Sequence, residues 1–161
     1  MYNALEIADY VLGYYSFERD INISNLKLQK VLYFLQANHL VITGRPLFVD
    51  NIEAWDFGPV IYDVYRKYRI YGGGSIPYNL IDKDREYSQF ILSDDRKIIS
   101  ELLDELQDYS ATALLSIIHN QKPWEDAYYS QVYEIFDRRY GNWKKIKVIP
   151  NKLLYEYFKE L

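Results

Sequence analysis

The strongest hydrophobic pattern in the chain lies in residues 24–44. Its apolar positions recur at the spacing of one face of an α-helix: Leu28, Val31, Leu32 and Leu35. Ser24 occupies the N-cap position, where its hydroxyl can accept a hydrogen bond from an otherwise unpaired backbone N–H. Gly44 stands where the helix has to end, because glycine enters the left-handed backbone region without steric cost. The pattern predicts one long amphipathic helix around which the rest of the chain is organised.

A short strand and a tight turn are expected after this helix. Residues 52–55 alternate in a way that is typical of a strand, with Trp55 at its end. Gly58 then permits a tight turn, and Pro59 suits the first position of a helix because it has no backbone N–H to satisfy. We therefore expect structural roles for Gly58 and Pro59 at the start of a helix over residues 59–71.

Weaker patterns predict the remaining elements. Asn3, Ser93 and Ser110 stand at N-cap positions ahead of apolar residues with helical spacing. Helices are expected over residues 3–18, 93–106, 110–119, 132–141 and 151–161, the last with Leu161 facing inward. Pro123 opens a helical turn over residues 123–127. Extended segments are expected over residues 76–78, 86–92 and 146–148. Together these elements predict a mainly α, compact single-domain fold over residues 1–161, with about six to seven helices and a small minor β element.

Composition limits the classes of function. The 161 residues include no cysteine, which excludes disulfides and thiolate metal sites and fits a reducing cytosol. There is no apolar run of about 18 residues and no signal-peptide pattern, so we expect a cytoplasmic protein without a membrane partner. The formal net charge of −4 argues against sequence-independent binding to phosphates, so no nucleic-acid partner is expected.

The candidate catalytic residues are few. The chain has two histidines, too few for a metal site, so neither a metal nor a cofactor is expected. His39 lies on the core side of its helix, where we expect it to be packed and hydrogen-bonded. His119 stands at a predicted helix end, where it can bond backbone carbonyls. The alternative is a small hydrolase that uses His119 as a general base with Ser116 or Glu125.

Aromatic and arginine residues suggest a binding surface instead. The chain contains 18 tyrosines, and tyrosine, tryptophan and arginine are enriched at interface hot spots. The candidate partner-binding residues are Trp55, Phe57, Tyr62, Tyr65, Arg66, Arg69 and Trp124. Helical spacing places Tyr62, Arg66 and Arg69 on one face of the helix over residues 59–71. The alternatives are core anchors for the two tryptophans and an ordinary solvated face for that helix.

Four segments together carry a family resemblance. They are LKLQKVLYFLQANHL (26–40), GRPLF (44–48), IEAWDFGPV (52–60) and LLSIIHNQKPWEDA (114–127). In this order and spacing they resemble the Panacea domain, a family that includes SocA-like antitoxins and phage-associated, GepA-like proteins found in prophages. His119 and Pro123 match the family's LSxxxHxxxPW segment.

The resemblance implies a function in protein binding. Panacea-domain proteins are antitoxins encoded beside a toxin, and the resemblance therefore implies a cognate protein toxin as the partner and no enzymatic activity. Some SocA-like members are adaptors that deliver the toxin to an ATP-dependent protease, which is the alternative for this chain. Many antitoxins also carry a DNA-binding segment, and we expect none in this chain beyond the matched residues.

Overall fold

The computed structural model describes residues 1–81, 86–130, 132–138 and 140–161. In chain order its elements are α1 (Ala4–Gly13), the π-helical segment η1 (Tyr14–Glu18), α2 (Asn25–Thr43), β1 (Ile52–Trp55), β2 (Gly58–Val60), α3 (Tyr62–Tyr68), the 3₁₀ turn η2 (Arg69–Tyr71), α4 (Tyr78–Ile81), α5 (Ser93–Leu106), α6 (Ala111–His119), α7 (Lys122–Tyr129), β3 (Tyr133–Asp137), β4 (Asn142–Ile146), β5 (Val148–Ile149) and α8 (Asn151–Phe158). The mainly α prediction with a minor β element is confirmed. The described residues form eight α-helices, slightly more than predicted. The single-domain prediction stays a prediction.

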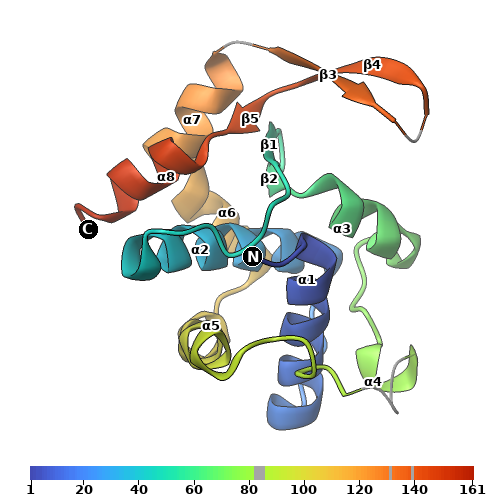
Figure 1. Ribbon diagram of the computed structural model, residues 1–161. Coiled ribbons are helices and arrows are strands. Elements are labelled where there is room, and N and C mark those ends of the chain that lie inside the picture. Colours follow the sequence, from blue (N-terminus) through green and yellow to red (C-terminus); the bar gives the residue numbers. More distant parts are fainter. Residues whose placement is uncertain (82–85, 131, 139) are drawn as a thin grey trace.

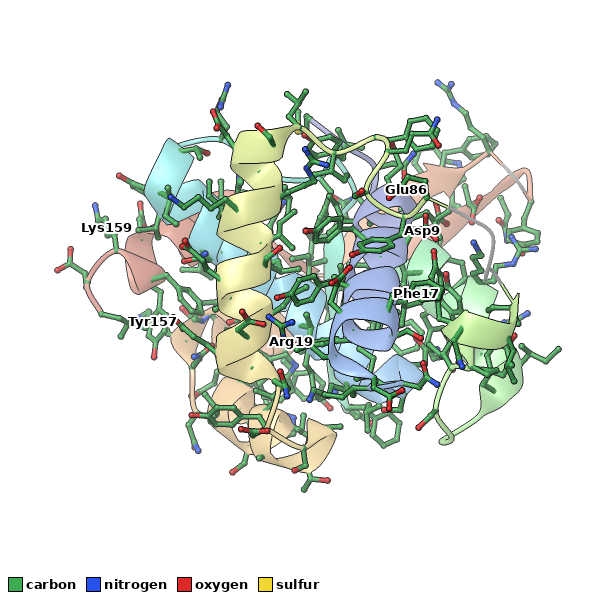
Figure 2. All side chains as sticks on the ribbon, turned by 90° about the horizontal axis from the view of Figure 1, so that it is seen from below. Asp9, Phe17, Arg19, Glu86, Tyr157 and Lys159 are labelled. Carbon is green, nitrogen blue, oxygen red and sulfur yellow. The ribbon has the colours of Figure 1, made fainter. Side chains whose placement is uncertain are left out.

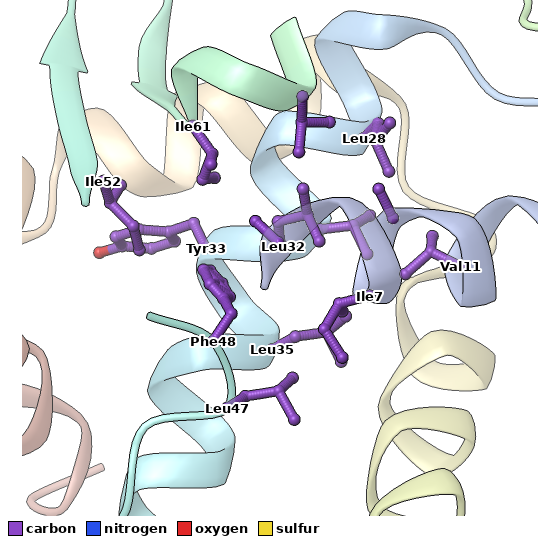
Figure 3. Packing of buried hydrophobic residues seen from close by; sticks show 14 of the residues in the cluster. Ile7, Val11, Leu28, Leu32, Tyr33, Leu35, Leu47, Phe48, Ile52 and Ile61 are labelled. Atoms are coloured by element: carbon purple, nitrogen blue, oxygen red, sulfur yellow. The ribbon is translucent and has the colours of Figure 1, made fainter. Parts of the chain in front are cut away.

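Helix α2 is the central element, and α1, α3, α5, α6 and α8 pack around it (Figure 1). Its ends are as predicted: Ser24 Oγ accepts a hydrogen bond from the Lys27 N–H at 3.1 Å, and Gly44 has a φ of 75°. Side chains of α1, the 47–48 segment and β1 pack against it (Figure 3). The expectation of an amphipathic helix is wrong, however. Polar residues of α2 are buried along with apolar ones, because several neighbouring elements pack around the helix.

Buried amides of α2 hold neighbouring loops in place. Gln36 Oε1 accepts hydrogen bonds from the N–H groups of Leu47 and Phe48, at 2.8 and 3.1 Å. Its Nε2 donates to the Phe48 carbonyl at 3.0 Å. Gln29 Oε1 accepts from the Ile61 N–H at 2.8 Å. Because buried backbone groups need partners, these two side chains fix the course of the chain on both sides of β1.

Tyrosines join α1 and η1 to α5. Tyr14 Oη donates to Asp104 Oδ1 at 2.7 Å, and Tyr15 Oη donates to the Leu103 carbonyl at 2.6 Å. Arg19 reaches across to the same helix (Figure 2) and pairs with Asp104 at 3.1 Å. Part of the high tyrosine content therefore serves helix packing, and the hydroxyls of Tyr14 and Tyr15 both have hydrogen-bond partners.

The strands form two small antiparallel sheets. One has the order β2-β1-β5, with Trp55 opposite Gly58, and the other pairs β3 with β4. The expected helix start at Pro59 is wrong, because Gly58–Val60 is strand β2 and α3 begins at Tyr62. Pro59 lies in an edge strand, where a missing N–H is tolerated. Gly58 does make a tight turn, with a φ of 99° that favours glycine.

The expected helix over residues 132–141 is also wrong, because β3 and β4 form a hairpin there. The segment is rich in aromatic and β-branched residues, which suit a strand, and Gly141 turns the chain with a φ of 64°. Phe136 lies opposite Trp143 in this hairpin. Residue 139 of the expected helix lies outside the described residues.

Smaller differences concern element boundaries. Residues 86–92 form turns rather than a strand, and Tyr78 already belongs to α4 instead of an extended segment. Ser93 is the first residue of α5, and Leu92 stands at the N-cap position. The strand expected over residues 146–148 is split between β4 and β5. Leu161 is 79% exposed and does not face inward. No helix within the described ranges is long and apolar enough to cross a membrane.

Candidate protein-interaction surface

A groove of about 410 Å³ lies between α2, the β1–β2 turn and the α3–η2 segment. We call it the aromatic groove. Four of the seven predicted partner-binding residues line it: Trp55, Phe57, Tyr65 and Arg69. Pro59, which was predicted to be structural, also lines it. The structure thus brings together residues that the sequence places on a strand, a turn and a helix.

The walls of the aromatic groove are ordered by ring packing. The rings of Trp55 and Tyr65 meet edge to face, with centroids 5.1 Å apart. Trp55 Nε1 donates to Glu53 Oε1 at 3.2 Å, so the indole has a fixed orientation. Phe57, in the turn between β1 and β2, is 65% exposed. A large apolar side chain is therefore presented to solvent beside preformed aromatic walls.

Lys30 of α2 supports this turn from below. Its side chain is buried, and Nζ donates to the Phe57 carbonyl at 2.7 Å and to the Leu26 carbonyl at 3.4 Å. Burial lowers the pKa of Lys30 to about 8, because removal from water disfavours the charged ammonium. A Cβ added at Gly58 would lie 3.6 Å from Nζ and 3.1 Å from Leu115 Cδ1. Glycine at this position leaves room for the Leu115 side chain.

Residues of α6 and α7 hold the turn from a second side. Trp124 Nε1 donates to the Trp55 carbonyl at 3.0 Å, and His119 Nε2 donates to the Asp56 carbonyl at 3.1 Å. The rings of His119 and Trp124 lie in contact, with centroids 4.2 Å apart. The Tyr128 hydroxyl donates to the Asp56 carboxylate. Trp124 is buried, as its core-anchor alternative expects, and its role in partner binding stays a prediction.

The two histidines have structural environments. His39 is buried, with Nε2 2.9 Å from Asp95 Oδ1 and Nδ1 2.8 Å from the Arg45 carbonyl, as predicted. His119 bonds a backbone carbonyl, although the carbonyl belongs to the β1–β2 turn rather than to its own helix. Among the described residues, the hydrogen bonds of His119 do not include Ser116 or Glu125. The geometry therefore gives no support to the hydrolase alternative.

No group of three or more histidine, aspartate or glutamate side chains in the described ranges could hold a metal.

Tyr62 and Arg66 lie away from the aromatic groove. Lys144 of β4 places Nζ 3.6 Å from the centre of the Tyr62 ring, and the Arg66 guanidinium lies 5.2 Å from the centre of the Tyr140 ring. Both residues therefore contact the β3–β4 hairpin segment. Arg69 instead lines the aromatic groove with Tyr65, which lies four residues before it. Their role in partner binding stays a prediction.

Sequence reasoning did not identify Lys30 or Leu26 as site residues. Both line the aromatic groove and lie four residues apart on α2, hence on one helix face. In the sequence, both residues lie on the helix face opposite the apolar residues Leu28, Val31, Leu32 and Leu35. Such a face is normally solvated, so the pattern alone did not reveal that another element covers it.

Comparison with known proteins identifies the family of the chain. The family described as "Antitoxin SocA-like, Panacea domain" matches residues 28–125. Antitoxin SocA of Caulobacter vibrioides (strain NA1000 / CB15N) is 38% identical over 113 residues, which cover 66% of this chain and 60% of that relative's length. No solved structure matches the chain significantly. The family match contains Lys30, the β1–β2 turn, His119 and Trp124, and it confirms the resemblance seen in the sequence. The chain belongs to the SocA-like antitoxin family of Panacea-domain proteins.

Proposed function

We propose that this chain is an antitoxin that neutralises a cognate protein toxin by binding it directly, and that the aromatic groove is the binding surface. Membership of the antitoxin family and the name of the similar Caulobacter protein support the antitoxin role. The observation that carries the binding surface is the exposed Phe57 at the edge of a groove walled by Trp55 and Tyr65. The proposed role is non-enzymatic and cytoplasmic.

The geometry suits a binding hot spot. Aromatic residues beside a preformed pocket contribute large buried area at a small cost in side-chain entropy. The β1–β2 turn is held by Lys30 on one side and by His119 on the other, so the partner need not order it. This preorganisation favours tight binding. Tyr62 and Arg66 are proposed as a secondary part of the contact surface. Trp124 is proposed to contribute to partner binding by holding the β1–β2 turn.

The test compares Phe57→Ala with Phe90→Ala. Phe90 is 57% exposed, close to Phe57 in exposure, but it lies in the turns before α5 and does not line the aromatic groove. Phe57→Ala should raise the Kd for the neighbouring-gene toxin by about 30-fold, or about 2 kcal/mol, and abolish rescue of toxin-expressing cells. Phe90→Ala should change neither. Both variants should melt close to the wild-type temperature, because exposed side chains contribute little to stability.

Full rescue by a folded Phe57→Ala variant would move the binding surface elsewhere, with Tyr62 and Arg66 as the next candidates. The abundance of the toxin in the rescued cells separates the two antitoxin mechanisms. Direct neutralisation leaves the toxin intact in a complex with the chain. An adaptor for an ATP-dependent protease would instead lower the toxin level.

A further inference from the structure

The charge of the aromatic groove is opposite to that of the chain. The chain has a formal net charge of −4, yet the residues that line the groove include two cations, Lys30 and Arg69, and no aspartate or glutamate. Arg69 is exposed at the rim. In the part of the chain that the structure describes, neither cation forms an ion pair with a carboxylate. The charged residues that line the groove are therefore all positive.

The charge of Lys30 is weakly screened because of its buried position. The ammonium is buried below the Phe57 carbonyl, at 2.7 Å, and its neighbours in the groove are apolar or uncharged. A charge in such surroundings is weakly screened, since the effective dielectric constant is far below that of water. Apolar walls also focus the field toward the opening. Lys30 can thus attract an anion in the groove without touching it, while Arg69 at the rim can donate hydrogen bonds to it directly.

The aromatic walls of the groove determine which partner side chain can enter it. Trp55, Phe57 and Tyr65 offer ring faces and edges to a side chain that enters the groove. A volume of about 410 Å³ admits a bulky apolar side chain. A ligand that fits both features combines an aromatic or large aliphatic residue with a nearby carboxylate.

We propose that the aromatic groove binds an acidic, hydrophobic segment of the toxin. A bulky apolar side chain of that segment would pack between Trp55, Phe57 and Tyr65. A neighbouring aspartate, glutamate or chain-terminal carboxylate would pair with Arg69 in the field of Lys30. This inference rests on the proposed function and specifies the chemistry of the partner at the same site.

The test is the binding of the purified toxin from the neighbouring gene to Arg69→Glu and Lys67→Glu variants, at low and at high salt. Lys67 is an exposed residue of α3 that does not line the groove, so the two variants change the net charge equally. Arg69→Glu should weaken binding at least about tenfold and flatten its salt dependence, because it places a like charge against the partner carboxylate. Lys67→Glu should stay within about threefold of the wild type, since its charge is exposed and screened.

Overlapping peptides that cover the toxin sequence identify the segment itself. The peptides that bind the wild type should contain an acidic residue beside a bulky apolar one, and Arg69→Glu should release them. Equal effects of the two charge variants, or binding only by basic or neutral peptides, would overturn the inference. Self-association of the wild type that Arg69→Glu abolishes would also overturn it, because the occupant would then be a second copy of this chain.

The two proposals fail in different ways. If the wild type does not bind the toxin, the proposed function fails and this inference falls with it. If the wild type binds and Phe57→Ala abolishes binding, while Arg69→Glu behaves like Lys67→Glu, the proposed function stands and only the inference about charge is overturned.

Discussion

At the scale of single residues, Lys30 is the unusual feature of the site. A lysine ammonium is rarely buried without a carboxylate, because transfer from water costs several kcal/mol. Here two backbone carbonyls receive its hydrogen bonds, one of them at the turn that presents Phe57. The lysine therefore positions the turn at a cost in stability. Such a cost is typical of residues that serve a site rather than the fold.

The burial of Lys30 predicts that the free energy of unfolding depends on pH. The folded-state pKa of Lys30, about 8, lies below its ordinary value of 10.5. Between these values the unfolded chain binds the proton and the folded chain does not, so the free energy of unfolding rises with pH. The rise attributable to Lys30 should be about 2 kcal/mol from about pH 7.5 to about pH 9.5.

Urea unfolding of the wild type and of Lys30→Met checks this value. The stability difference between the two should grow in favour of the wild type as the pH rises, because methionine has no proton to lose. Lys97→Met, which removes an exposed ammonium on α5, should keep the pH dependence of the wild type. Parallel pH curves for the wild type and Lys30→Met would show that burial does not perturb Lys30.

At the scale of secondary-structure elements, locally encoded features were predictable and paired strands were not. The caps at Asn3, Ser24 and Ser110 and the left-handed Gly44 depend on contacts within a few residues, and all are confirmed. Pro59 was assigned to a helix because its strand depends on pairing with β1. The 132–141 segment was misread for the same reason, since β3 is defined by its pairing with β4. Short strands take their identity from partners that the local pattern does not show.

A second prediction belongs to α2. Gln36→Ala should destabilise the protein by about 2–4 kcal/mol, because it leaves the buried N–H groups of Leu47 and Phe48 without partners. Asn38→Ala changes a half-buried amide on the same helix and should cost less than about 1 kcal/mol. Chemical denaturation measures both. Equal losses for the two variants would mean that Gln36 contributes only its helix propensity.

At the scale of the whole molecule, the site results from four separate parts of the chain. Lys30 from α2 and His119 from α6 hold opposite sides of the turn before β2, and Arg69 from η2 completes the rim of the aromatic groove. Composition alone identified the aromatic and arginine residues of the groove. It did not identify Lys30, because the burial of that residue depends on packing against Phe57, which lies 27 residues away in sequence.

The proposed binding surface requires that the turn carrying Phe57 contacts the toxin. Site-specific photocrosslinking can detect this contact, with p-benzoylphenylalanine introduced in place of Phe57 in one variant and in place of Phe90 in another. We expect a covalent adduct with the toxin from position 57 and none from position 90, in complexes that both elute at the size of the wild-type complex. An adduct from position 90 alone would show that the toxin binds the segment before α5 and not the turn that carries Phe57.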